Sequence, residues 1–334
     1  MGERSRPQAG RQACRWGRED AGEGSGTETT MNGTKQAAFQ AGRSQRQSVR
    51  YVIITPARNE GRAIEETILS VLRQTLQPIE WVIVDDGSRD ETGEIIDCYA
   101  KKYSWISTVH RPNRGFRNPG GGVVEAFTDG YCLLKSYTWE YIVKLDADLI
   151  MPSDYFETCF EHFEVDPKLG IGGGTVYESV DGTIRIERNP AFHVRGATKI
   201  YRRACWDALG GLFPAPGWDT LDEVKANMLD WRTRTFPDVR VRQRRPTGSN
   251  DGSWNDQVKN GRADYICGYH PLFMLVKCLR RLGEKPYGIA SLGLGYGYVS
   301  SFLKRAPQVG DRALIRYLRH QQLRRLLFAE TIWK

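Results

Sequence analysis

From residue 51 to residue 60 the chain reads YVIITPARNE, an apolar run followed by a polar loop that contains a proline. The run predicts a β-strand over 51–55, and apolar residues three and four positions apart predict a helix over 60–74. The same order then recurs, with further strands predicted at 81–84, 106–110 and 141–145 and further helices at 90–103 and 122–135. Such alternation is typical of an α/β domain with a mainly parallel sheet.

Polar segments follow three of these four strands, at 56–60, 85–90 and 146–148. Open α/β sheets bind ligands at the carboxyl ends of their strands, because the loops there meet at one edge of the sheet. We therefore expect the three segments to contribute to one site.

The segment after the strand at 141–145 contains Asp146 and Asp148, two carboxylates separated by one alanine. Carboxylate oxygens are hard ligands that suit divalent cations, and a cation held there can bridge the two phosphates of a diphosphate. An ordinary aspartate-rich turn or a helix cap is the alternative interpretation.

The segment after the strand at 81–84 begins Asp85-Asp86-Gly87-Ser88. A carboxylate here can accept hydrogen bonds from the base or ribose of a nucleotide, and Gly87 allows a tight turn. Asp90 is predicted to cap the helix that follows.

In chain order, the motifs ITPARNE (54–60), DDGS (85–88), NRG (113–115) and DAD (146–148) resemble those of family 2 glycosyltransferases. The resemblance covers roughly residues 50–250 and implies a GT-A fold, which is a Rossmann-like α/β fold with a mainly parallel mixed sheet and flanking helices. It also implies that Asp148 coordinates Mn²⁺ or Mg²⁺ on the donor diphosphate and that Asp146 contacts the metal or the ribose. The nucleotide is expected to contact Thr55, Pro56, Arg58, Glu60, Asp85 and Asp86. Arg114 and Arg117 lie in a loop where guanidinium groups could meet phosphate or base, or could simply be solvated.

A helix predicted over 218–231 carries three acidic residues near its start, Asp219, Asp222 and Glu223. In the family that the chain resembles, an acidic pair in this region removes the proton from the acceptor hydroxyl, but the usual Glu-Asp order is absent here. We favour Asp222 as the general base and keep Asp219 and Glu223 as candidates. The alternative is that all three only suit the positive end of the helix dipole.

Charge is unevenly distributed, with +4 over residues 1–50, −5 over 51–276 and +9 over 277–334. An acidic body argues against nucleic-acid binding, and a basic C-terminal segment suits anionic lipid headgroups or is simply a solvated helix. The uncharged run 287–303 is short for a transmembrane helix, so we expect it to lie at the membrane surface. A buried helix pair or a dimer contact is the alternative.

We divide the chain into a disordered extension (1–48), a GT-A domain (49–255) and a helical, basic and apolar C-terminal region (256–334). The extension has almost no aliphatic residues with which to form a core. Because the first apolar run starts at Tyr51, we expect no signal peptide and a cytoplasmic enzyme attached peripherally to the inner face of the membrane.

The sequence thus predicts an inverting transfer of one sugar from a nucleoside-diphosphate sugar to a lipid-linked or polysaccharide acceptor, as in cell-envelope or exopolysaccharide synthesis. A single transfer is favoured because residues 243–246 lack the Q-x-x-R-W pattern of processive synthases. A nucleotidyltransferase acting on sugar phosphates would usually carry a glycine-rich basic loop after the first strand, which is absent here. A non-catalytic nucleotide-sugar-binding protein is the second alternative, and the oligomeric state stays open.

Overall fold

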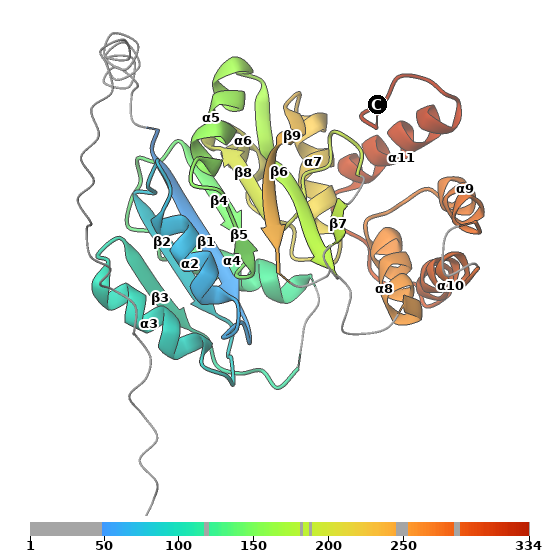
Figure 1. Ribbon diagram of the computed structural model, residues 1–334. Coiled ribbons are helices and arrows are strands. Elements are labelled where there is room, and N and C mark those ends of the chain that lie inside the picture. The colour runs from blue at the N-terminus through green and yellow to red at the C-terminus, as the bar shows by residue number, and fades with distance from the viewer. Residues whose placement is uncertain are drawn as a thin grey trace, which may run out of the picture. The chain divides into compact units, whose positions relative to one another are not determined.

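The computed structural model describes residues 49–116, 120–180, 183–186, 189–244, 253–283 and 288–333. Within these ranges the strands form one nine-stranded sheet in the order β3-β2-β1-β4-β8-β6-β9-β5, with β7 paired to β6 (Figure 1). The predicted extension 1–48 and Arg117 lie outside the described residues.

The first half of the sheet is parallel and closely follows the sequence prediction. Four strands lie side by side with parallel pairing: β1 (Tyr51–Ala57), β2 (Glu80–Asp85), β3 (Ile106–His110) and β4 (Tyr141–Leu145). They alternate with α2 (Ile64–Leu72), α3 (Thr92–Lys102) and α4 (Gly121–Cys132).

The second half of the sheet is mixed. β8 (Thr198–Arg202) runs antiparallel to both β4 and the long strand β6 (Leu169–Val180), which pairs in parallel with β9 (Arg232–Gln243). The short strands β5 (Leu149–Ile150) and β7 (Thr183–Ile186) pair antiparallel with β9 and β6. The pairing of β4 with β8 brings the chain after residue 190 next to the end of β4, where the predicted metal-binding segment begins.

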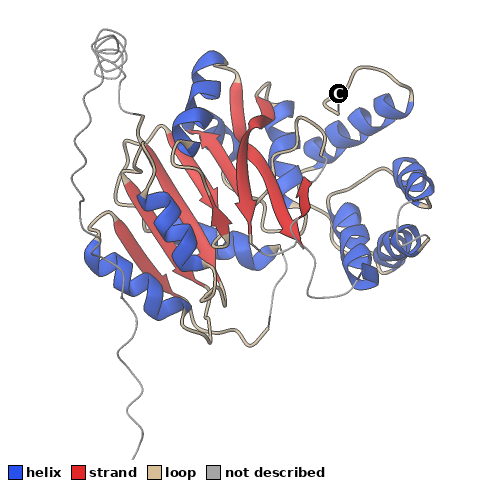
Figure 2. Ribbon diagram, viewed as in Figure 1, coloured by secondary structure: helices blue, strands red, loops and turns tan. Residues whose placement is uncertain are grey.

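Helices cover both faces of the sheet (Figure 2). One apolar core joins the sheet to α2, α3 and α5 (Tyr155–Val165), and a second joins the other face to α4, α6 (Arg203–Leu209) and α7 (Trp218–Met228). β2 is buried along its whole length, as expected for a central strand that has helices on both sides.

In the described residues after β9 the chain forms α8 (Ser253–Ile266), α9 (Pro271–Arg281), α10 (Ile289–Leu303) and α11 (Arg312–Leu326). A third core, with Leu294, Tyr298, Leu314 and Leu318, packs them against Leu221 and Val224 of α7. The predicted helical character of this region is confirmed. No helix in the described ranges is both long and apolar enough to cross a bilayer.

Candidate active site

The carboxyl ends of the parallel strands are level with one another, as the sequence predicted. Asp85 at the end of β2 is in register with Ala57 of β1 and with His110 of β3. On the other side of β1, Ile54 is in register with Lys144, two residues before Asp146. The polar segments after β1, β2 and β4 therefore meet at one edge of the sheet.

The turn that carries Asp146 and Asp148 is fixed by a buried threonine of α2. The Thr67 hydroxyl donates to the carbonyl of Ala147 at 2.9 Å and accepts from the amide of Leu149 at 3.1 Å. Asp148 is only 7% exposed, and one of its carboxylate oxygens is 3.3 Å from the amide nitrogen of the Gln243 side chain. α2 thus fixes the turn at the end of β4, and β9 contacts the carboxylate of Asp148.

Asp146 forms an ion pair with Lys144, whose ammonium group also donates to the carbonyl of Gly196. The lysine side chain is 3% exposed, whereas that of Asp146 is 30% exposed. The buried ammonium group of Lys144 therefore compensates the charge of Asp146, while the Asp146 carboxylate stays accessible to a ligand. The sequence analysis did not single out Lys144, because a lysine within an apolar strand carries no motif.

Asp86 lies among three arginines. Arg111 Nη1 donates to its carboxylate at 2.6 Å, Arg114 forms an ion pair with it, and Arg58 Nη1 lies 3.6 Å from it. Arg58 also donates to the backbone carbonyl of Asp86 at 2.7 Å, which joins the ends of β1 and β2. Arg114 therefore lies beside Asp86, as does Arg111, which the sequence analysis did not single out.

Asp85 faces β3 and contacts His110. One oxygen accepts from the amide of Ser88 at 2.8 Å and the other lies 3.1 Å from His110 Nδ1. Gly87 has φ = 73°, and a Cβ there would lie 2.6 Å from the Cα of Asn113, so both the backbone conformation and the space require glycine.

The residues at the end of β1 and in the loop after it face different parts of the protein. The hydroxyl of Thr55 is in the core and accepts from Trp81 Nε1 at 2.9 Å, so this side chain does not face the site. The backbone amide of Glu60 donates to Thr92, and that of Gly61 donates to Asp90 at 3.0 Å. Asp90 also accepts from the amide of Thr92 at 3.2 Å, so it ties the start of α3 to this loop.

Asp222 and Glu223, at the second turn of α7, are fully buried. The carboxylate of Asp222 accepts from Lys199 at 2.9 Å and from the hydroxyl of Tyr201 at 2.5 Å, both on β8. Glu223 accepts from the amide of Val194 at 2.7 Å and lies 2.9 Å from His193 Nδ1. Burial raises the pKa of Asp222 to about 7, with Lys199 opposing the shift.

Asp219, in the first turn of the same helix, is not fully buried. A Cβ on Gly196 would lie 3.3 Å from Asp219 Cβ, and Gly196 is also the residue whose carbonyl accepts from Lys144. The Trp218 ring lies 5.5 Å from the ammonium groups of both Lys144 and Lys199. The start of α7 is therefore packed against the lysine that pairs with Asp146.

The residues at the end of β4 suit a divalent cation bound together with a substrate. Mg²⁺ and Mn²⁺ are typically held by one or two protein carboxylates plus phosphates and water, and Asp146 and Asp148 supply such oxygens. Within the described part of the chain, no group of three or more potential ligands lies close enough to hold a metal by itself.

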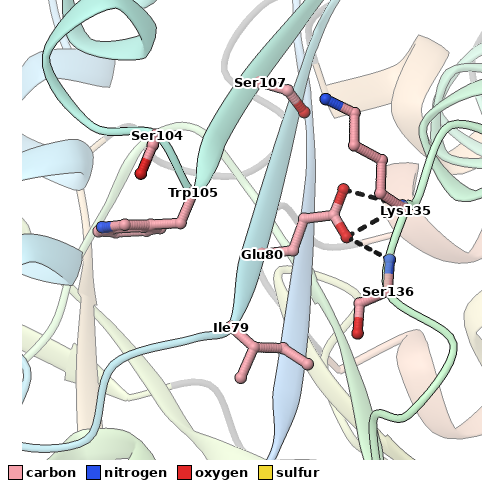
Figure 3. Close-up of a pocket in the computed structure, with 7 residues that line it drawn as sticks. All are labelled: Ile79, Glu80, Ser104, Trp105, Ser107, Lys135 and Ser136. Atoms are coloured by element: carbon pink, nitrogen blue, oxygen red, sulfur yellow. Dashed lines mark hydrogen bonds between the residues drawn. The ribbon is translucent and has the colours of Figure 1, made fainter.

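A separate cavity of about 340 Å³ lies at the opposite, amino ends of β2 and β3 (Figure 3). Its residue Glu80 accepts hydrogen bonds from the backbone amides of Lys135 and Ser136 at 3.0 and 2.9 Å. This carboxylate secures the chain after α4, and the cavity is remote from the strand ends that carry the site.

The family model described as "Glycosyl transferase family 2" matches residues 52–214. This part of the chain belongs to glycosyltransferase family 2. The match contains the strand ends of β1, β2 and β4 but stops before α7, which holds the candidate bases.

Curated relatives align with less than half of the chain. A glycosyltransferase of Streptococcus pneumoniae, GlyG, is 32% identical over 39% of this chain and 40% of its own length. The poly-beta-1,6-N-acetyl-D-glucosamine synthase of Staphylococcus aureus is 34% identical over 34% of this chain and 25% of its own length.

Among solved structures, a mannosyltransferase from Pyrobaculum calidifontis, described in complex with GDP-Man and Mn²⁺, has a TM-score of 0.50 at 18% identity. The match covers 84% of this chain and 86% of that one. At this identity the likeness concerns the fold alone, and the predicted GT-A type of α/β fold is confirmed.

Proposed function

We propose that this family 2 glycosyltransferase moves one sugar from a nucleoside-diphosphate sugar to a lipid-linked or glycan acceptor, with inversion at the anomeric carbon. The observation that carries the proposal is the arrangement of Asp146 and Asp148 at the same sheet edge as Asp85 and Asp86. Carboxylates next to arginines can bind the base and ribose, and the pair after β4 supplies ligands for a cation on the diphosphate.

Asp148, with Asp146 beside it, would hold Mn²⁺ or Mg²⁺. A bound cation would neutralise charge that develops on the departing nucleoside diphosphate. Arg58, Arg111 and Arg114 are suited to the donor because their guanidinium groups can exchange Asp86 for oxygens of the nucleotide.

Asp219 replaces Asp222 as the proposed general base. A general base must first reach the proton that it removes, and a suitable pKa matters only after that. Asp222 has a pKa of about 7 but no exposed surface, and Lys199 and Tyr201 occupy its oxygens. Asp219 is partly exposed, so its carboxylate can take the acceptor proton while the acceptor oxygen attacks the anomeric carbon and the bond to the diphosphate breaks.

The acceptor class rests on a named relative. The poly-beta-1,6-N-acetyl-D-glucosamine synthase is named for making a polysaccharide, and this supports a role in cell-envelope or exopolysaccharide synthesis. We place the reaction at the inner face of the membrane, where a lipid-linked acceptor would be found.

The test is a donor panel of UDP-, GDP- and dTDP-sugars, assayed for transfer and for slow hydrolysis with Mn²⁺, Mg²⁺ or a chelator. We expect one nucleotide class to be turned over, and only with metal. Asp148→Ala should abolish turnover and metal-dependent donor binding, because the cation loses its ligand. Asp230→Ala is the matched control, since this carboxylate is 90% exposed and pairs only with the surface residue Lys168 among the ion pairs described. Equal metal-dependent donor affinity in Asp148→Ala and in the unchanged protein would overturn the assignment.

A further inference from the structure

Two consecutive helices near the C-terminus each expose a row of large apolar side chains. On α9 and its C-terminal cap, the four residues at intervals of three and four are 47–57% exposed: Leu272, Leu275, Leu279 and Leu282. On α10 the equivalent row is 44–73% exposed: Ile289, Leu292, Tyr296, Val299 and Leu303. Intervals of three and four residues place each row on one face of its helix.

The opposite side of α10 is used for packing. Ala290, Leu294 and Tyr298 are at most 7% exposed, and Leu294 and Tyr298 belong to the third core. A Cβ on Gly293 would lie 3.0 Å from Gln257 Cβ on α8, so these two helices pack closely. The exposed row therefore faces away from the rest of the protein because the orientation of α10 is fixed by its buried side.

The two rows lie next to each other. Ser291 of α10 donates to the carbonyl of Cys278 of α9 at 2.7 Å, and a Cβ on Gly295 would lie 3.7 Å from Cys278 Sγ. On the helical surface Cys278 neighbours Leu275 and Leu282, and Gly295 neighbours Leu292 and Val299, because residues three and four apart are adjacent. Both apolar rows thus run along the contact between α9 and α10.

The charge around this surface favours an anionic lipid bilayer as its partner. Residues 271–305 contain six basic residues and one acidic residue, and α10 contains no charged residue. Arg280, Lys304 and Arg305 are exposed at the ends of the two rows. A second copy of this chain docked by a twofold axis would bring these like charges together, whereas an anionic bilayer would neutralise them.

We propose that the apolar rows of α9 and α10, with Arg280, Lys304 and Arg305, form a docking surface for an anionic lipid bilayer. The apolar side chains enter the boundary between headgroups and acyl chains, and the basic groups meet the headgroups. This attachment is independent of sugar transfer, so it can hold or fail without bearing on the proposed activity.

The experiment is sedimentation of the full chain with vesicles of phosphatidylcholine alone or mixed with phosphatidylglycerol, at low and high salt, without donor or acceptor. We expect binding to the anionic vesicles that weakens with salt. Leu279→Gln combined with Val299→Gln should lower that binding about tenfold or more, because apolar insertion and headgroup attraction act together. Lys304→Gln combined with Arg305→Gln should lower binding to anionic vesicles and reduce its salt dependence.

The matched control is Val165→Gln, which changes an 83% exposed apolar residue at the end of α5 and should not alter binding. A second pair, Leu275→Gln with Leu292→Gln, gives an independent measurement if the first pair unfolds, as judged by circular dichroism. Absence of binding by the unchanged protein would overturn the proposal, and so would binding by both apolar double variants that equals that of the unchanged protein. A dimer in sedimentation velocity that these variants convert to monomer, with vesicle binding unaffected, would identify a second copy as the partner instead.

Discussion

Lys199 distinguishes Asp222 and Glu223 from Asp219, the three acidic residues near the start of α7, because among the ion pairs described it pairs with the side chains of the first two only. Its ammonium group is fully buried and lies 2.9 Å from Asp222 and 2.7 Å from Glu223, and it also donates to the backbone carbonyl of Asp219. Burial alone would lower the pKa of Lys199, but Asp222 and Glu223 outweigh it and the pKa is raised. Asp222 and Glu223 therefore compensate a buried lysine, and Asp219 is the residue that we propose as the base.

The first residue-scale prediction compares Asp219→Asn with Asp222→Asn. Asp219→Asn should lower kcat by about 10²-fold or more while donor affinity and stability change little, as expected for loss of a general base. Asp222→Asn should instead lower the free energy of unfolding by about 3 kcal/mol or more, because Lys199 loses one of its compensating charges in the interior. Steady-state kinetics and urea denaturation of both variants measure the two effects. The reverse pattern, with turnover lost only in a stably folded Asp222→Asn, would return the role of base to Asp222.

The second residue-scale prediction concerns Thr67, whose hydroxyl bridges Ala147 and Leu149. Thr67→Val keeps the shape but leaves a buried carbonyl and a buried amide without this partner, so it should cost about 1–3 kcal/mol of stability. Because the turn also carries Asp146 and Asp148, metal-dependent donor affinity should fall as well. Thr128→Val is the control, since among the described residues that hydroxyl bonds only to the carbonyl of Val124 within its own helix. Unchanged donor affinity in a stable Thr67→Val would show that the turn does not need this anchor.

At the scale of elements, the part of the fold that local periodicity encodes was predictable from the sequence. The predicted strands at 51–55, 106–110 and 141–145 correspond to β1, β3 and β4 within two residues at each end. The pairing of β6 with β9 was not predicted, because it joins segments about 60 residues apart and leaves no local pattern. The sequence also could not show which of the three acidic residues of α7 is accessible. They lie at positions i, i+3 and i+4 and so share one helical face, and the packing of β8 against that face determines which of them are buried.

His110 links three elements and gives a prediction with a pH dependence. Its ring nitrogens lie 3.1 Å from Asp85 on β2 and 3.0 Å from Asp97 on α3. Hydrogen bonds to Asp85 and Asp97 raise the pKa of His110. A raised pKa means that the protonated ring stabilises the fold fully below the ordinary histidine pKa of about 6.5, and that this contribution is lost as the pH rises through the higher folded value.

His110→Gln should therefore destabilise the protein more at acidic than at alkaline pH. The urea midpoint of both proteins, measured from pH 6 upward, tests this, and the difference should shrink as the pH rises. The ring is 44% exposed, so solvent screening keeps the expected effect modest. A difference that does not vary with pH would mean that the imidazole acts through packing or uncharged hydrogen bonds only.

At the scale of the whole molecule, the third core makes the C-terminal helices part of the same folded unit as α7. Leu314 and Leu318 of α11 are fully buried and share this core with Leu221 and Val224 of α7, the helix whose first turn contains Asp219. The same region thus has two sides, one packed under the proposed base and one carrying the exposed rows of α9 and α10. Removing it would disturb both.

The last prediction separates these two sides. Leu318→Ala leaves a cavity beneath α7 and should lower the free energy of unfolding by about 2–5 kcal/mol in a single cooperative transition. Turnover should fall as well, because the helix that carries Asp219 loses packing, while binding to anionic vesicles should be kept by the folded fraction. Leu279→Gln should weaken binding to anionic vesicles and leave stability and turnover nearly unchanged. Its side chain is 57% exposed and is not among the residues of the third core. Urea denaturation, turnover and vesicle sedimentation of the two variants form the test. Two separate unfolding transitions, with turnover unchanged in Leu318→Ala, would mean that the C-terminal helices fold and act apart from the sheet.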